Sequence, residues 1–297
     1  MHFSLELPRH YRIPEILAFH ARDREGLAER TGADFIRKGF VIDGTPVVLD
    51  VLLRSGRADC HVLTDGELKD ASPDALQRIA RNLLALSIDP DAFETAMKND
   101  ILFGALVERQ RGLRIPQTAT PFEAITWAVV GQQINLAFAI ALRRSLILLA
   151  GRQHSSGLWC YPDAAAVARL NADDLVQCKF SRAKAETLIR FARMVRTGEL
   201  PLDHWQGSSA EEIETTLLAV KGIGPWTANY SLLRGFGCPD CSLHGDAAIR
   251  TALHRLSGNG VKVGKPTVAE TQLVLQRYKP HRSLAAAHLW ASLSFAA

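Results

Sequence analysis

The chain has 297 residues, of which 47% are hydrophobic and 22% charged. This length usually corresponds to two domains, and the composition excludes wholesale disorder. The net charge of +4 and the pI near 8.9 are only weak support for a polyanionic partner, because an ordinary globular protein has the same balance. The start of the chain lacks a secretory pattern and no apolar run is long enough to span a bilayer, so we expect a cytoplasmic protein with no membrane partner.

The five cysteines are odd in number and three of them are scattered, which argues against a secreted disulfide framework. Cys238 and Cys241 have the spacing of metal ligands, and His244 lies close behind them. A tetrahedral zinc site needs four ligands and an iron–sulfur cluster needs four cysteines. We therefore expect no metal here, and the role of the pair stays open.

The first hundred residues alternate strand and helix patterns. Alternation of apolar and polar residues predicts strands, and Asp43-Gly44 predicts a hairpin turn between two of them. The predicted strands are 3–7, 40–42, 47–52 and 60–63. Helical spacing predicts helices at 14–21 and 74–86, the second started by Ser72-Pro73. These elements predict an α+β unit with an antiparallel sheet.

The polar segment 111–118 contains Gly112 and Pro116 and indicates a linker. After it, helical periodicity dominates and no convincing strand is present. The predicted helices are 121–131, 135–150, 162–170, 172–178, 181–197, 210–220, 225–235, 246–256, 267–278 and 283–294. We therefore predict an α+β domain over residues 1–112 and an all-α domain over residues 113–297.

The segment 220–228 lies between two apolar helices and predicts a tight hairpin. Gly222 and Gly224 permit positive φ, and Pro225 suits the first turn of the second helix. Ile223 is expected to point inward and hold the helices together. The turn would expose backbone N–H groups at a helix N-terminus, where a nucleic-acid phosphate binds well. Taken alone, Gly-x-Gly is equally typical of a plain helix–helix connection.

The run Gly-Ile-Gly-Pro-Trp-Thr-Ala-Asn-Tyr at 222–230 resembles the hairpin of the helix-hairpin-helix DNA glycosylase superfamily. Members of that superfamily place a catalytic Asp at the start of the next helix, where this chain has Asp246. Within the superfamily, segments 121–124, 130–133, 181–185, 279–283 and 288–290 are most similar to the bacterial enzymes that remove 3-methyladenine and other alkylated bases. The resemblance implies double-stranded DNA as partner and the bacterial nucleoid as location, and we expect a monomer.

Breaking an N-glycosidic bond develops positive charge on the sugar, which a carboxylate stabilises while it orients or deprotonates water. Asp246 is the candidate; its alternative role is a helix N-cap, and both can hold. Asp240 is the rival acid, which we interpret as a loop residue. Superfamily members that also cut the strand use a Lys just after the hairpin, where this chain has Trp226. The resemblance therefore implies a monofunctional glycosylase. A member acting on oxidised or mismatched bases, or a non-catalytic DNA-binding protein, stays open.

A base excised from a duplex must leave the stack, and aromatic faces are worth roughly 1–3 kcal/mol per stacked base. Trp226, Tyr230 and Trp290 match the pocket aromatics of the resembled enzymes, although each taken alone is as typical of a core. Such a cleft attracts a cationic alkylated base through cation–π contacts.

The DNA-binding hairpin is expected to use Lys221, Gly222, Ile223, Gly224 and Thr227, with Lys221 facing phosphate. The resembled enzymes wedge a bulky apolar residue into the duplex from the loop after Gly131-Gln132. Here Gln133 stands at that place and Ile134 follows, so either residue is a candidate wedge. We expect no cofactor, apart from a monovalent cation on the hairpin carbonyls that the resemblance implies.

Overall fold

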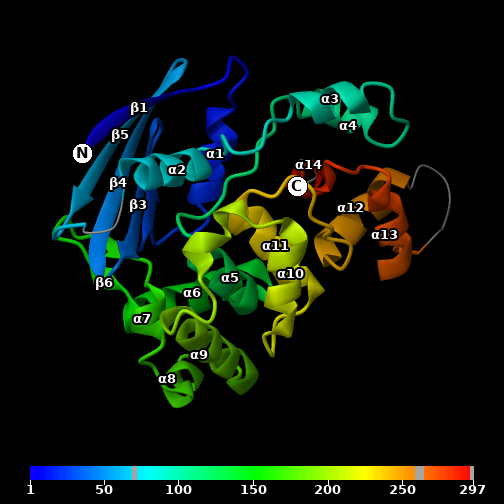
Figure 1. Cartoon of the computed structure of the whole chain (residues 1–297). Helices are drawn as coiled ribbons and strands as arrows, with labels where there is room; N and C mark the ends of the chain where they lie inside the picture. Colours follow the sequence, from blue (N-terminus) through cyan, green and yellow to red (C-terminus); the bar gives the residue numbers. More distant parts are fainter. Residues whose placement is uncertain (69–71, 258–263, 295–297) are drawn as a thin grey trace.

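The computed structural model describes residues 1–68, 72–257 and 264–294. An N-terminal antiparallel sheet stands beside a larger helical body (Figure 1). The strands of this sheet have the order β1-β5-β4-β3-β2. They are β1 (His2–Glu6), β2 (Glu29–Thr31), β3 (Phe35–Ile42), β4 (Thr45–Arg54) and β5 (Arg57–Thr64). The predicted sheet is confirmed, and only the three-residue β2 has no counterpart among the predicted strands.

The turn between β3 and β4 is the predicted hairpin, with positive φ at both Asp43 and Gly44. Helices α1 (Ile13–His20) and α2 (Pro73–Leu83) pack against the sheet, because Ile16 and Leu83 belong to the same buried cluster as its strands. Ser72 caps α2 by accepting a hydrogen bond from the backbone N–H of Ala75, as the Ser72-Pro73 signal predicts.

The helical body carries the predicted helices with shifts of a few residues at their ends. They are α5 (Pro121–Gly131), α6 (Leu136–Ala150), α7 (Ala164–Val167), α8 (Ala172–Gln177), α9 (Arg182–Arg196), α10 (Ala210–Ala219), α11 (Pro225–Phe236), α12 (Ala247–Ser257), α13 (Val268–Gln276) and α14 (Arg282–Ser294). The 3₁₀ turn η1 (Leu202–Gly207) lies between α9 and α10 and has no counterpart among the predicted helices. Side-chain caps begin many of them, for example Thr120 on α5 and Asn135 on α6. The α+β fold class with a helical second part is confirmed.

The expectation that no strand follows residue 118 is wrong. The short strands β6 (Arg152–Gln153) and β7 (Trp159–Cys160) form a hairpin, and Tyr161 continues it as a bridge to Phe40 of β3. Gly39 allows this approach, because a Cβ there would lie 2.2 Å from the carbonyl oxygen of Trp159. Two-residue strands show no periodicity, so only the long-range pairing reveals them.

Two unpredicted helices, α3 (Asp91–Met97) and α4 (Gly104–Arg109), precede the predicted linker. Phe93 and Phe103 belong to the core of the helical body, and the Phe103 ring lies 4.4 Å from that of Tyr278. The segment 111–118 has no regular structure, as predicted, but it is not an exposed linker: Ile115 and Gln117 are buried. The domain division at residue 112 stays a prediction.

A buried ion cluster joins the sheet to the helical body. Lys38 of β3 pairs with Glu29 and Glu123, and Arg143 of α6 donates to Glu123 at 2.7 Å. Burial alone would raise the pKa of Glu29, but Lys38 and Arg143 hold it well below its ordinary value. The opposite charges satisfy one another, which makes their burial tolerable. None of the helices in the described part of the chain is both long and apolar enough to cross a membrane.

Candidate active site

The hairpin between α10 and α11 depends on one glycine. Gly222 has φ +99°, and a Cβ there would lie 2.1 Å from the hydroxyl oxygen of Thr187. Gly224 instead has φ −104° and ψ 177°, which other residues adopt, so of the two glycines expected to permit positive φ only Gly222 uses it. Ile223 is buried in the helical core, which confirms that it points inward.

The N-terminus of α11 has no side-chain cap, and among the described residues no side chain accepts from the N–H groups of its first turn. Lys221 is exposed beside it. Such an end favours anions, as expected for phosphate contact. Thr227 is buried instead of facing solvent, and its hydroxyl accepts a hydrogen bond from Nε2 of Gln132 at 2.8 Å. The same Gln132 nitrogen donates to the carbonyl of Gly222 at 3.0 Å, so these bonds tie the hairpin to the loop after α5.

Asp246 is held by four donors. Its Oδ1 accepts from the backbone N–H groups of Ala248 and Ile249, at 2.9 and 3.0 Å, and so caps α12. Its Oδ2 accepts from Nε1 of Trp226 at 2.9 Å, and Oδ1 also accepts from Nε1 of Trp290 at 3.2 Å. The half-buried carboxylate is thus fixed in position while the cap is formed, so the two roles considered for Asp246 are compatible.

The three predicted aromatics lie together beside this carboxylate, which two of them, Trp226 and Trp290, contact; we call the three the aromatic cage. The rings of Trp226 and Tyr230 stack with centroids 5.1 Å apart, and Trp290 meets Tyr230 edge-on at 6.2 Å. Both tryptophans are half-buried, which leaves part of each ring accessible. Trp226 and Trp290 thus hold Asp246 through their N–H groups while part of each ring stays exposed.

Three further residues at the cage have no signal in the sequence pattern. Nε1 of Trp127 on α5 donates to the hydroxyl of Tyr230 at 3.1 Å. The guanidinium of Arg234 lies 5.8 Å from the ring centroid of Tyr230 and 4.7 Å from that of Phe19. Phe19 is on α1, so the N-terminal part of the chain also contributes. Trp127 and Arg234 look like ordinary positions of their helices in the sequence, so nothing singles them out. No motif links Phe19 to residues two hundred positions later.

The loop after α5 places the two candidate wedge residues differently. Gln133 is exposed and has φ +56°, whereas Ile134 is half-buried and packs against the helical core. Asn135 then caps α6. Which residue enters the duplex stays a prediction, and this geometry favours Gln133 because its side chain is free to leave the protein surface.

Substitution of Gln133 by Ala is expected to lower single-turnover excision on one alkylated duplex on the order of tenfold, because a wedge offsets part of the unstacking cost. Gln133→Leu should retain or raise the rate, since an apolar wedge fills the gap at least as well. Ile134→Ala is the matched control. If Gln133→Ala leaves the excision rate unchanged and Ile134→Ala lowers it strongly, the wedge is Ile134 and not Gln133.

Cys238 and Cys241 lie at the joint between α11 and α14. Oγ of Ser283 donates to the carbonyl of Cys238 at 2.7 Å and accepts from the N–H of Cys241 at 3.0 Å. A hydrogen bond from Cys241 lowers the pKa of Cys238 to about 7. Asp240 forms an ion pair with Arg282 at 2.7 Å, which agrees with its interpretation as a structural loop residue. Within residues 1–68, 72–257 and 264–294, no three His, Cys, Asp or Glu side chains are grouped as metal ligands.

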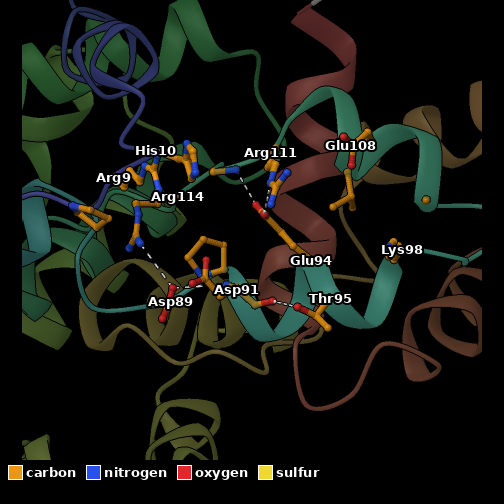
Figure 2. A pocket seen from close by; sticks show the side chains of 15 residues that line it. Arg9, His10, Asp89, Asp91, Glu94, Thr95, Lys98, Glu108, Arg111 and Arg114 are labelled. Atoms are coloured by element: carbon orange, nitrogen blue, oxygen red, sulfur yellow. Dashed lines mark hydrogen bonds and ion pairs between the residues drawn. The ribbon is translucent and has the colours of Figure 1, made fainter.

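A separate concavity of about 790 Å³ shares no residue with the cage (Figure 2). It lies between the loop at 8–10, the helices α3 and α4, and segment 111–114. Positive and negative side chains pair with one another in it. Arg114 pairs with Asp89, and Glu94 faces Arg111 and accepts a hydrogen bond from the N–H of Gly112. This mixed surface has no feature of a base pocket.

Residues 126–280 match the model of the HhH-GPD superfamily base excision DNA repair protein. The chain is 32% identical over 208 residues to the DNA-3-methyladenine glycosylase of Bacillus subtilis, covering 69% of this chain and 68% of the relative. It is 26% identical over 277 residues to DNA-3-methyladenine glycosylase 2 of Escherichia coli, covering 93% and 92%. The solved 3-methyladenine DNA-glycosylase from Archaeoglobus fulgidus has the same fold, with a TM-score of 0.83 at 22% identity over 99% of each chain. These matches confirm the predicted family: the chain belongs to the HhH-GPD superfamily of base excision DNA repair proteins.

Proposed function

We propose that this protein is a monofunctional DNA glycosylase that hydrolyses the N-glycosidic bond of alkylated bases, such as 3-methyladenine, in base excision repair. The observation that carries the proposal is the Asp246 carboxylate, held by the indole N–H groups of Trp226 and Trp290. The same two rings and Tyr230 form the aromatic cage. A fixed negative charge therefore lies beside surfaces that stack an extruded base.

The reaction follows from this arrangement. The hairpin and Lys221 hold phosphates, the damaged nucleotide rotates out of the duplex, and its base stacks in the cage. As the bond between C1′ and the base nitrogen breaks, its electron pair leaves with the base and positive charge develops on the sugar. Asp246 stabilises that charge and orients water, whose oxygen bonds to C1′ while its proton is released. A cationic base departs as a neutral molecule, so no strong general acid is required.

Strand cleavage is not part of the proposal. The position after the hairpin is Trp226, which has no amine to form a Schiff base, and Lys221 is in the exposed turn. We further propose that the protein acts as a monomer on double-stranded DNA in the bacterial cytoplasm, at the nucleoid. The similarity to glycosylases of two bacteria, Bacillus subtilis and Escherichia coli, supports that location.

A monovalent cation at the hairpin backbone also remains a proposal. The carbonyls of Lys221 and Gly222 accept hydrogen bonds from Arg190 at 3.1 Å and Gln132 at 3.0 Å. Each carbonyl oxygen has a second lone pair, so both can still ligate a cation shared with a phosphate. DNA affinity is measured in potassium and in tetramethylammonium salts at the same ionic strength. Equal affinities in the two salts would rule out the cation site.

The test of the function is product analysis on N-methylated DNA. The protein should release free 3-methyladenine and 7-methylguanine, and the strand should stay intact until alkali cleaves the abasic site. Borohydride should trap no covalent protein–DNA adduct. Tight DNA binding with no released base would instead indicate a non-catalytic DNA-binding protein, and a trapped adduct would contradict the monofunctional mechanism.

A further inference from the structure

The segment that leads into Asp246 forms a tight turn at the protein surface. The backbone N–H of Asp246 donates to the carbonyl of Leu243 at 3.0 Å, so residues 243–246 form a β-turn with His244 and Gly245 at its centre. Leu243 is buried in the helical core and Asp246 caps α12, which fixes both ends of the turn. Gly245 is exposed and His244 is half-buried, so the tip of the turn faces solvent next to the carboxylate.

The imidazole of His244 is oriented through one of its two nitrogens. Its Nδ1 is hydrogen-bonded to Oγ of Ser242 at 2.9 Å. The backbone N–H of Ser242 donates to Oδ1 of Asn229 at 2.8 Å, and the amide of this buried residue also donates to the carbonyl of Pro225 at 3.1 Å. The ring is therefore held, through Ser242, by the first turns of α11, the helix that follows the hairpin.

The other ring nitrogen, Nε2, is not used inside the protein. It has no hydrogen-bond or ion-pair partner in the part of the chain that the structure describes. The neighbouring acid, Asp246, accepts from four other donors. A hydroxyl both donates and accepts, so Ser242 can hold the ring in the state in which Nε2 carries the proton. His244 thus presents an oriented donor whose acceptor the protein does not supply.

The space in front of this turn is open because residue 245 is a glycine. The φ of Gly245 is not in the left-handed region, and an added Cβ would meet only Cβ of Trp226, at 3.9 Å. That distance is an ordinary contact, so the fold itself does not require glycine here. The missing side chain instead lets another backbone approach the tip of the turn closely.

The position of the turn indicates which acceptor approaches. In the proposed reaction, Asp246 lies beside C1′ of the extruded nucleotide, and the sugar of that nucleotide carries a phosphate on each side. Two residues of extended chain span at most about 7 Å, so His244 lies within reach of the phosphates bonded to the sugar that Asp246 faces. A hydrogen bond from an imidazole N–H to a phosphate oxygen is charge-assisted and therefore strong.

We propose that His244 binds, through Nε2, a phosphate bonded to the damaged nucleotide, and that Ser242 is the positioning residue that orients its ring. This inference rests on the proposed glycosylase function. The hairpin and Lys221 hold the strand, and His244 adds a contact beside C1′ that keeps the sugar against Asp246 after the nucleotide has rotated out. The ligand is the phosphodiester itself, so the contact is the same whichever base is damaged.

The experiment measures equilibrium affinity for a duplex that carries a tetrahydrofuran analogue of the abasic nucleotide, which has no base to release. In a set of these duplexes, one phosphate at a time around the analogue is replaced by an uncharged methylphosphonate. In the wild type, the replacement of one phosphate bonded to the analogue should weaken binding on the order of tenfold. In His244→Ala the same replacement should weaken binding less than about twofold, because the partner of that phosphate is already absent.

Two further variants test how the contact is made. His244→Gln keeps an N–H donor but cannot carry a positive charge, and Ser242→Ala keeps the imidazole but removes the hydroxyl that orients it. In each of them, the cost of that one methylphosphonate should lie between the wild-type and His244→Ala values. A merely structural role of either residue would weaken binding to every duplex by the same factor and leave this cost unchanged.

The matched control is His254→Ala. His254 is also half-buried, and it lies on α12 roughly 12 Å from Asp246 along the helix axis. In this variant every methylphosphonate should cost as much as in the wild type. In His244→Ala the phosphates held by the hairpin should keep their full cost, which distinguishes a lost contact from a lost fold. If His244→Ala changes the cost of no phosphate, the inference is overturned.

Base release from a duplex that carries 7-methylguanine is measured on the same wild-type sample. A wild type that releases no base, but depends on His244 at one phosphate, would overturn the proposed function and leave the phosphate contact standing. A wild type that releases the base, and whose methylphosphonate costs are all unchanged in His244→Ala, would overturn this inference and leave the proposed function standing.

Discussion

Replacement of Asp246 by Asn is expected to slow base release on the order of 10³-fold, while affinity for undamaged duplex changes by less than about twofold. The substitution keeps the size of the side chain and removes the charge that stabilises the sugar cation. It also places an amide where the indole N–H groups of Trp226 and Trp290 now meet carboxylate oxygens. Single-turnover excision and equilibrium binding on the same duplex measure the two effects separately.

The fold should survive this change. Asn is as good an N-cap as Asp, and its Oδ1 can continue to accept from the N–H groups of Ala248 and Ile249. The melting temperature should therefore stay close to that of the wild type. If Asp246→Asn released the base at a near wild-type rate, Asp246 would have no catalytic role and would act only as a helix cap.

Replacement of Gly222 by Val should weaken binding to damaged and undamaged DNA alike, on the order of tenfold or more. Val resists φ +99°, and its Cβ would collide with Thr187, so the turn must move. Phosphate contacts made by this turn carry no lesion information, which is why lesion preference should not change. Affinity for matched damaged and undamaged duplexes measures both.

The control for Gly222→Val is Gly56→Val, in the turn between β4 and β5. Gly56 also has positive φ, at +72°, but nothing lies within 4 Å of an added Cβ. The Gly56→Val variant should lower the free energy of unfolding through the same backbone strain and leave DNA affinity unchanged. If Gly222→Val altered lesion preference and left affinity intact, the hairpin would not be the phosphate-binding element.

Much of the fold follows from local signals in the sequence. The Asp43-Gly44 turn, the Ser72 cap and the helices that begin after Thr120 and Asn135 are all formed where predicted. What escaped prediction depends on contacts between distant segments. The β6–β7 hairpin forms beside Gly39, and α3 and α4 are short helices stabilised by Phe93 and Phe103 in a core they share with the C-terminal helices.

The candidate site divides in the same way. Trp226, Tyr230, Trp290 and Asp246 are brought together as the resemblance implied, because the hairpin helix α11, the start of α12 and helix α14 set their places. The pattern could not show that two indoles donate to the carboxylate. Nor could it show Arg234 at the cage, because Arg234 looks like an ordinary helical position until tertiary packing buries it.

The central claim is that this pocket excises alkylated bases, and a panel of duplexes tests it most directly. One sequence carries, in turn, 7-methylguanine, 8-oxoguanine, a mismatched normal base and no lesion, and base release is measured under single-turnover conditions. The arrangement of Asp246 and the aromatic cage predicts release from the 7-methylguanine duplex, its loss in Asp246→Asn, and no release above background from the other three. Preferred release of 8-oxoguanine or of the mismatched base would contradict the account.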